Sequence, residues 1–176
     1  SQIIDAGGTG NDNTSIWFIV WGENTCHMFY PKGSQIGLNH MDKGQQTLED
    51  GNGGYYEGYR DHFKWDLGLS VRDWRFIARI ANIDVSDAQT FGESTDNSPP
   101  IIMRMIDAVN QLENMDKGQP VIYMNRTIKT FLDKVATSKA NVNLSIEEFG
   151  GRPTTSFQGI PIRRVDAILN NESQVT

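Results

Sequence analysis

The sequence predicts an α+β fold, and three observations carry that prediction. A continuous apolar run, Ser15–Gly22, has the length of a buried strand. Apolar side chains then alternate along residues 63–80, as they do in strands with one buried face. Finally, Pro120–Met124 reads as a strand, and helical apolar spacing follows it directly. Strands therefore dominate the first half of the chain, and a strand alternates with helices in the second.

Residues 1–14 are rich in Gly, Asn and Asp, and this composition predicts a loop that leads into the first strand. The GGTG within it lacks the Gly-Lys-Ser/Thr ending of a phosphate loop, and no strand precedes it. Ser15–Gly22 should lie at the centre of a sheet. Turn residues occupy Gly22–Thr25, and Cys26–Pro31 should return as the second strand of a hairpin.

Residues 32–54 are rich in glycine and show little periodicity, so we expect a long excursion there. The alternation that follows changes face near Arg72–Asp73. A strand cannot do this without a bulge or bend, because a one-residue slip turns every side chain over. This stretch therefore predicts two strands, or one long bulged strand. The apolar residues fall on odd and then even positions: Phe63, Trp65, Leu67, Leu69, Val71, and then Trp74, Phe76, Ala78, Ile80.

Asp84–Ser98 reads as a polar linker, with Ser98 as N-cap and Pro99 and Pro100 in the first turn of a helix that ends near Gly118. That helix has the apolar stripe Ile102, Met105, Ile106, Val109 and Leu112. The polar linker separates a β-rich part of the chain from an α/β part. The predicted organisation is therefore a leading loop over 1–14, a β-rich lobe over 15–90 and an α/β lobe over 91–176.

Asn125 should cap the last helix, because its side chain can accept from a free backbone N–H of the first turn. We expect Phe131 and Leu132 to face a sheet, and Lys129 and Asp133 to face water. The stripe of this helix is Ile128, Phe131, Leu132, Val135 and Ala136. Gly151–Leu169 predicts a turn, one extended strand and an exit, and the polar tail that follows should be frayed.

The formal net charge of −6 argues against nucleic-acid binding driven by counterion release. The pair Arg163 and Arg164 does not overturn that conclusion. No apolar run approaches the roughly 20 residues that span a bilayer, so no membrane partner is expected. The single cysteine, Cys26, excludes an intrachain disulfide and suits synthesis in a reducing cytoplasm.

No residue qualifies as catalytic, cofactor-binding or metal-binding. Cys26 and His27 are adjacent and point to opposite faces of a strand, and His40 and His62 are the only other histidines. No serine lies in a G-x-S-x-G turn. An alternative stays open, a small β-rich carbohydrate-binding or hydrolase domain. It would be built on two groups: the carboxylates Glu49, Asp50, Glu57, Asp61, Asp66, Asp73 and Asp84, and the aromatics Trp17, Trp21, Trp65 and Trp74.

Three stretches resemble the major capsid proteins of short-tailed double-stranded DNA phages. YMNRTIKTFL (Tyr123–Leu132) and FQGIPIRRVDAIL (Phe157–Leu169) are similar to the axial domain, and Trp21–Ser86 to the block before it. The resemblance implies the Hong Kong ninety-seven-like fold, with axial and peripheral elements. It further implies a virion subunit, made in the bacterial host cytoplasm, whose copies form pentamers and hexamers around DNA.

The resemblance implies no catalytic residue, no cofactor and no small-molecule substrate. Scaffold, portal or decoration proteins would be further partners, and packaged DNA would be contacted only non-specifically. The long excursion at 32–54 would contact a neighbouring subunit. Family subunits carry an N-terminal arm, an extended loop and a spine helix before this block, and residues 1–176 hold none of these. We therefore expect the chain to be the C-terminal half of a longer protein.

Overall fold

The computed structural model describes residues 2–33, 36–86, 101–137, 144–149 and 152–175. The chain divides into two compact units, one of residues 1–27 and 71–176 and one of residues 28–70. This division corrects the predicted lobe boundary near residue 90. Strands on both sides of that boundary belong to one sheet, because β2 (Asn13–Trp21) pairs with β8 (Gln119–Met124).

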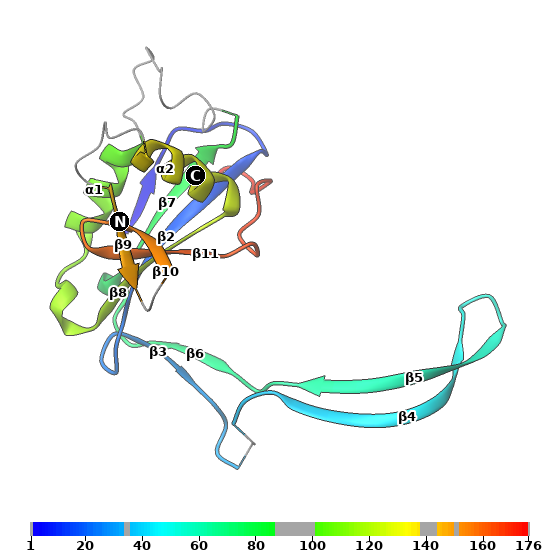
Figure 1. Cartoon of the computed structure of the whole chain (residues 1–176). Coiled ribbons are helices and arrows are strands. Elements are labelled where there is room, and N and C mark those ends of the chain that lie inside the picture. The colour runs from blue at the N-terminus through cyan, green and yellow to red at the C-terminus, as the bar shows by residue number, and fades with distance from the viewer. Residues whose placement is uncertain (1, 34–35, 87–100, 138–143, 150–151, 176) are drawn as a thin grey trace. The chain divides into compact units, whose positions relative to one another are not determined.

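The first unit is a mixed sheet with the strand order β1-β7-β2-β8-β11-β10-β9 (Figure 1). Its strands are β1 (Ile3–Asp5), β2, β7 (Ile77–Asp84), β8, β9 (Leu144–Phe149), β10 (Arg152–Phe157) and β11 (Ile160–Arg164). β2 is antiparallel to both of its neighbours, β7 and β8, whereas β1 runs parallel to β7 and β11 runs parallel to β8. The predicted central strand is confirmed.

One face of this sheet forms the core. Ile16, Phe18 and Val20 alternate along β2 and are almost fully buried. They share a single apolar cluster with side chains from helices α1 (Ile101–Gln111) and α2 (Arg126–Thr137). Each fully buried aliphatic or aromatic side chain contributes about 1.5–3 kcal/mol relative to leaving it exposed, so burial on this face stabilises the unit. Neither helix is long and apolar enough to cross a membrane.

Helix α1 confirms the predicted helical stripe. Met105 and Val109 are buried, and Ile102 and Ile106 pack against the cluster from its margin. The helix ends at Gln111, seven residues before the predicted end near Gly118, and a separate 3-10 turn at Met115–Lys117 precedes that glycine. The predicted cap Ser98, with Pro99 and Pro100, lies outside the described residues.

Asn125 caps α2 as predicted, because its Oδ1 accepts from the Thr127 backbone N–H at 2.9 Å. Ile128 and Leu132 are fully buried, and Phe131 is half-buried. The side chain of Val135 lies outside the described residues. The expectation that Lys129 and Asp133 face water holds only in part. Asp133 pairs with Lys129 at 2.8 Å and also accepts from the Thr155 hydroxyl of β10.

The last third contains a hairpin where the sequence predicted a single strand. β10 and β11 are antiparallel and joined by Gln158 and Gly159. Both residues have positive φ, +51° and +80°, which is the backbone of a two-residue turn whose twist matches that of the flanking strands. The turn was missed because Gln-Gly is not among the common residue pairs for it.

Both chain ends are more ordered than predicted. Ile3–Asp5 forms the edge strand β1 beside β7, inside the stretch that we expected to be a loop. The tail was expected to fray, but hydrogen bonds hold it to the sheet. The Glu172 N–H donates to the Asn13 carbonyl, the Glu172 carboxylate accepts from Ser15 Oγ, and the Val175 N–H donates to Asn82 Oδ1. Glu172 and Asn170 make side-chain hydrogen bonds, whereas Asn171, Ser173 and Gln174 are exposed.

The second unit contains a long two-stranded ladder, β4 (Asn39–Glu49) and β5 (Tyr55–Lys64), which are antiparallel (Figure 1). β4 thus lies inside the excursion that we expected to lack regular structure. The register shifts between Asp42 and Gln45, where Gly44 has a φ of +68°. A bulge of this kind hides the alternation on which sequence reading depends.

The predicted hairpin of Ser15–Gly22 with Cys26–Pro31 is wrong. Cys26–Phe29 is a strand, β3, but it pairs with β2 only at Trp21↔Cys26, in parallel, and with β6 (Gly68–Val71) beyond, so no simple hairpin forms. In the turn before it, the Thr25 hydroxyl donates to the Val20 carbonyl at 2.7 Å. The predicted change of face at Arg72–Asp73 is confirmed. Asp73 there caps a 3-10 turn at Trp74–Phe76, after which β7 begins.

Candidate interaction surface

Large apolar side chains are exposed mainly in the unit of residues 28–70. Within its described part no residue is buried, although it is rich in aromatics. The exposed ones are Met28, Phe29, Tyr30, Ile36, Leu38, Met41, Tyr55, Tyr56, Tyr59, Phe63, Trp65, Leu67 and Leu69. An isolated two-stranded hairpin is marginally stable in water, and exposed apolar patches of this kind mark interaction sites.

One face of the β4–β5 ladder carries an aromatic row. Tyr55, Tyr59 and Phe63 project to the same side of β5, since side chains two residues apart share a face. They are 73%, 82% and 60% exposed. The His40 ring stacks on Phe63 with centroids 4.6 Å apart, and His40 Nε2 lies 2.8 Å from the Asp61 carboxylate. Only Phe63 of these three thus has a ring partner among the described residues.

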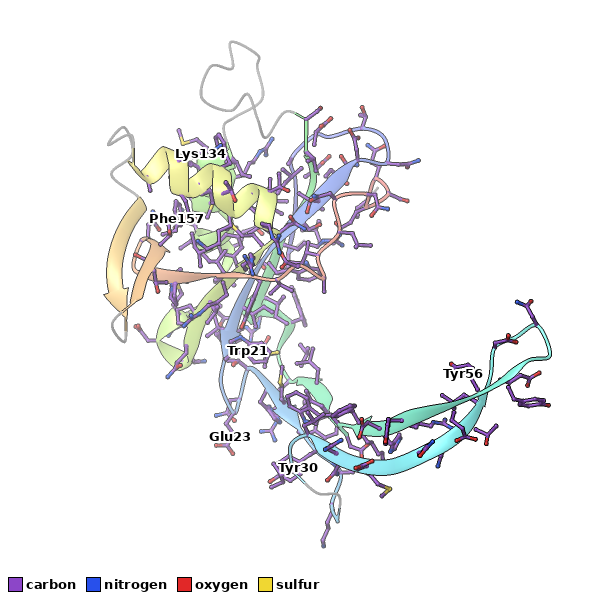
Figure 2. All side chains as sticks on the ribbon, turned by 45° about the vertical axis from the view of Figure 1, so that its right-hand side comes forward. Trp21, Glu23, Tyr30, Tyr56, Lys134 and Phe157 are labelled. Atoms are coloured by element: carbon purple, nitrogen blue, oxygen red, sulfur yellow. The ribbon has the colours of Figure 1, made fainter. Side chains whose placement is uncertain are left out.

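On the opposite face of the ladder, the Leu48 side chain packs against Gly58. Gly58 lies between Leu48 and Tyr56, and a Cβ there would meet Leu48 Cδ1 at 2.9 Å. Leu48 and Tyr56 are cross-strand partners near the turn. Tyr56, labelled in Figure 2, is nevertheless 53% exposed as a residue. Along β5, this face carries one exposed aromatic side chain, whereas the other face carries Tyr55, Tyr59 and Phe63.

The predicted alternation of residues 63–71 becomes a continuation of this surface rather than a core. Phe63, Trp65, Leu67, Leu69 and Val71 are all between 46% and 61% exposed. The prediction treated apolar alternation as a sign of burial within the chain. In this part of the chain the apolar face stays largely exposed among the described residues, although the His40 ring stacks on Phe63. Sequence periodicity cannot distinguish an exposed apolar face from a buried one.

The candidate metal ligands do not converge. Cys26 is buried, and burial raises the pKa of its thiol, so it behaves as an inert small apolar residue. Across the described ranges, no group of three His, Cys, Asp or Glu side chains could hold a metal ion. His40 is engaged with Asp61 and Phe63 instead.

The carboxylates considered for hydrolysis are divided among separate local partners. Asp66 pairs with Lys64 at 2.9 Å, and Glu57 accepts from the Thr47 hydroxyl at 2.6 Å. Asp73 accepts from the side chain and backbone of Arg75, and these bonds lower the pKa of its carboxyl. A general acid needs a raised pKa, so Asp73 is chemically unsuited to that role.

The four tryptophans do not form one platform. Trp17 lies under the Arg79 guanidinium at 4.9 Å, and Trp21 donates from Nε1 to the Tyr123 hydroxyl at 2.8 Å. Trp65 and Trp74 are more than half exposed, but they belong to different units of the chain. Two of the four are therefore already occupied by contacts within the first unit.

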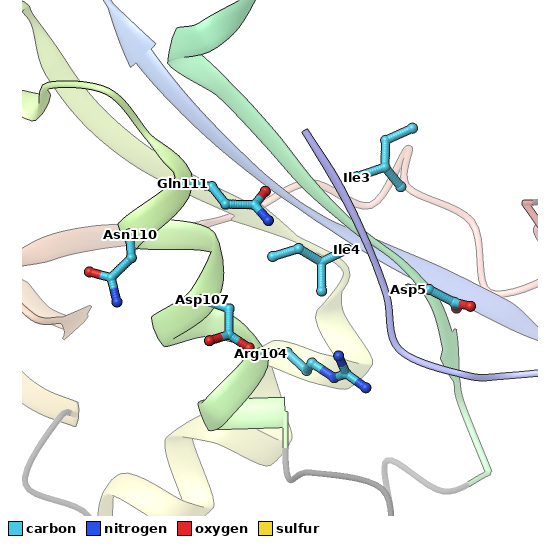
Figure 3. A pocket seen from close by; sticks show the side chains of 7 residues that line it. All are labelled: Ile3, Ile4, Asp5, Arg104, Asp107, Asn110 and Gln111. Atoms are coloured by element: carbon cyan, nitrogen blue, oxygen red, sulfur yellow. The ribbon is translucent and has the colours of Figure 1, made fainter. Parts of the chain in front are cut away.

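A shallow pocket of about 450 Å³ lies between β1 and α1 (Figure 3). Its lining residues are Ile3, Ile4, Asp5, Arg104, Asp107, Asn110 and Gln111. Asp5 accepts from Asn82 Nδ2 and the Gly7 backbone N–H, and these bonds lower the pKa of its carboxyl. Asp5 is thus an anion near neutral pH and cannot supply a proton to a substrate.

The basic pair Arg163–Arg164 is partly compensated. Arg164 Nε lies 3.5 Å from the Asp166 carboxylate, which also pairs with Arg126 at 2.8 Å. The hydrogen bond from Arg126 lowers the pKa of Asp166. The site is therefore a mixed-charge surface rather than a basic groove, in line with the sequence argument against phosphate binding.

Comparison with known proteins places this surface in context. The family described as Major capsid protein GP7 matches residues 1–176. A solved structure of bacteriophage Epsilon15, described as a validated near-atomic resolution structure from cryo-EM and modeling, is similar in fold, with a TM-score of 0.56. The two are 47% identical over 96% of this chain and 52% of that one. A search of curated proteins found no match.

Proposed function

The chain belongs to the Major capsid protein GP7 family. We propose that its second unit, residues 28–70, which we call the hairpin unit, binds a second copy of the chain within a phage shell. The family is one of virion structural proteins rather than enzymes, so the hydrolase alternative is set aside. The chain spans about half the length of the solved capsid chain that it matches. The mixed α/β structure matches part of that Hong Kong ninety-seven-like protein.

The observation that carries the proposal is the lack of any buried residue in the described part of residues 28–70. A segment of that composition gains little by folding alone, because ordering each residue costs about 1–2 kcal/mol of backbone entropy. Its apolar surface must be covered in the functional state. A capsid protein meets other copies of itself at high local concentration, so a second copy is the natural partner.

The aromatic row Tyr55, Tyr59 and Phe63 is our proposed centre of that contact. Aromatic side chains dominate binding energy at interfaces, where they are surrounded by polar residues that exclude water. Here Glu57 and Asp61 lie on the same face of β5 between the aromatic residues. An apolar centre with charged residues around it favours a specific contact over non-specific hydrophobic association.

The finer shell architecture is also proposed. The first unit, in which residues 91–176 share a sheet with β1, β2 and β7, would form the axial lobe near the centre of pentamers and hexamers. The arm, extended loop and spine helix of the family would complete the contacts. Scaffold, portal or decoration proteins would be further partners, and the net charge of −6 supports only non-specific contact with packaged DNA.

The test is self-association of the chain with and without the aromatic row. Sedimentation velocity over a concentration series should show association for the unaltered chain. The double variant Tyr59→Ser, Phe63→Ser should associate at least tenfold more weakly, because each buried ring contributes more than about 1 kcal/mol and 1.4 kcal/mol is about tenfold.

Met103→Gln is the matched control, because Met103 is 54% exposed but lies on α1 in the first unit. It should leave association unchanged. Equal weakening by both variants would mean that general hydrophobicity drives association. Undiminished association of the double variant would remove the hairpin from the contact.

A further inference from the structure

The turn that joins β4 to β5 contains Asn52 followed by Gly53, the one Asn-Gly pair in the sequence. We propose that Asn52 is a site of spontaneous covalent modification, in which the backbone nitrogen of Gly53 attacks the Asn52 side-chain amide. The inference concerns the chemistry of the turn itself and does not depend on what the hairpin binds.

Hydrogen bonding in the turn leaves the attacking nitrogen free. Asp50 Oδ1 accepts from the backbone N–H of Asn52 at 2.8 Å and from that of Gly54 at 3.0 Å. The Asp50 N–H donates to the Gly54 carbonyl at 3.0 Å. The N–H of Gly53 lies between these held groups and has no hydrogen-bond partner among the described residues. It is therefore available as a nucleophile once deprotonated.

Steric access favours the same attack. Gly53 has no Cβ, and its φ of +84° lies in a region that glycine adopts readily. No heavy atom approaches within 4 Å of the position that a Cβ would occupy. Asn52 is exposed as well, and its side-chain amide has no hydrogen-bond partner in the described structure. Neither a neighbouring side chain nor a competing bond obstructs ring closure.

The reaction balances with water as the only co-reactant. A bond forms between the Gly53 nitrogen and Asn52 Cγ, the Cγ–Nδ2 bond breaks, and ammonia leaves with the Gly53 proton. The product is a five-membered succinimide ring. Water then opens the ring at either carbonyl, which leaves an aspartate at this position or its isomer, in which the chain continues through the side chain. No electrons are transferred.

Other asparagines lack this combination. Asn82 and Asn125 are buried, and their side chains are held by Val175 and by Thr127 respectively. Asn110 is exposed, but it lies within helix α1 and is followed by Gln111. A helical backbone holds the next N–H in its hydrogen-bond ladder, away from the side chain. Asn110 is therefore a suitable internal reference.

Modification would alter the turn in two ways. It adds a negative charge where Glu49, Asp50 and Glu57 already lie close along the chain. The isomer also inserts one more backbone atom into the connection between Glu49 and Tyr55, which are paired across the ladder. As the protein ages, the negative charges in the β4–β5 turn should therefore repel one another more strongly. The pairing register of the two strands next to the turn should also become less well defined.

The experiment is timed incubation of the unaltered chain in mildly alkaline buffer, followed by peptide mapping with mass spectrometry. The Asn52 peptide should gain about 1 Da and split into two chromatographic forms, at least tenfold faster than the Asn110 peptide changes. Asn52→Gln should abolish the early mass gain, because a longer side chain closes a ring less readily. Gly53→Ala should slow it at least tenfold.

An Asn52 peptide that stays intact while the Asn110 peptide changes would overturn the proposal. Conversion of Asn52 at the same rate in Gly53→Ala would also overturn it, because direct hydrolysis rather than ring closure would then be at work. Circular dichroism should confirm that both variants retain the fold of the first unit.

Discussion

Arg79 Nη2 donates to the Glu172 carboxylate at 3.1 Å, joining residues that are 93 positions apart in the chain. Ser15 Oγ lies between them, accepting from Arg79 and donating to Glu172. Nearby, Asn82 exchanges hydrogen bonds with the backbone of Val175 in both directions. The polar tail is thus fastened across strands β2 and β7, and it is an integral part of the first unit.

Glu172→Ala should destabilise the first unit by about 1–3 kcal/mol, because it leaves the half-buried Arg79 guanidinium without its carboxylate. Urea unfolding monitored by tryptophan fluorescence measures this directly. Glu23→Ala is the matched control, because Glu23 is exposed and makes no side-chain contact of this kind within the described structure; it should stay within about 0.5 kcal/mol. If both substitutions have equal effects, the tail is not fastened in solution.

Asn125→Ala should cost about 1 kcal/mol or more, since it removes the cap of α2 together with the bond from Asn125 Nδ2 to the Ile168 carbonyl. Asn125→Asp separates the two effects, because it keeps the capping oxygen and loses the donor. It should therefore fall between Ala and the unaltered chain in thermal unfolding. Thr130→Ala, exposed in the middle of the same helix, should be nearly silent. A silent Asn125→Ala would disprove the cap.

Leu132→Ala should cost about 2–5 kcal/mol in denaturant unfolding, because Leu132 is fully buried between α2 and the sheet. Lys134→Ala should stay within about 0.5 kcal/mol, since Lys134 lies on the outer side of the same helix (Figure 2). Comparable losses for the two variants would place the apolar face of α2 elsewhere.

Asp5 should make stability depend on acidity. Its folded-state pKa lies below the ordinary value of 3.8, chiefly because Asn82 donates to it. Its contribution is therefore present above pH 3.8 and is lost as the pH falls through the lowered folded-state pKa. Unfolding free energies measured between neutral pH and about pH 3 should fall less steeply for Asp5→Asn than for the unaltered chain. Parallel curves would mean that Asp5 contributes nothing.

Much of the first unit was predictable from local patterns. The run Ser15–Gly22 and the stripe of α2 identify a central strand and the helix on it, because burial there is within one chain and leaves a period in the sequence. Asn125 was predictable for the same reason, since capping is a local interaction. The edge strand at Ile3–Asp5 was not, because three residues are too few to show a period.

The candidate surface was harder to predict, and the reason is physical. Phe63, Trp65 and Leu67 show the alternation of a buried face but lie exposed in the hairpin unit. Periodicity reports that a face is apolar and says nothing of what covers it. The tail network of Arg79, Ser15 and Glu172 was missed because its members are distant in sequence and individually ordinary.

The β4–β5 ladder, described above for its side chains, also has consequences through its backbone. Within the described structure each strand pairs only with the other, so two long edges, of eleven and ten residues, carry unused N–H and C=O groups. Such edges invite uncontrolled stacking of chains into fibres. The bulge at Gly44 interrupts the regular edge, and the charges of Asp42, Lys43 and Arg60 beside it disfavour pairing with another strand. Near the isoelectric point of about 5.0 the repulsion between whole chains vanishes, and storage there should favour fibrous precipitate over ordered particles.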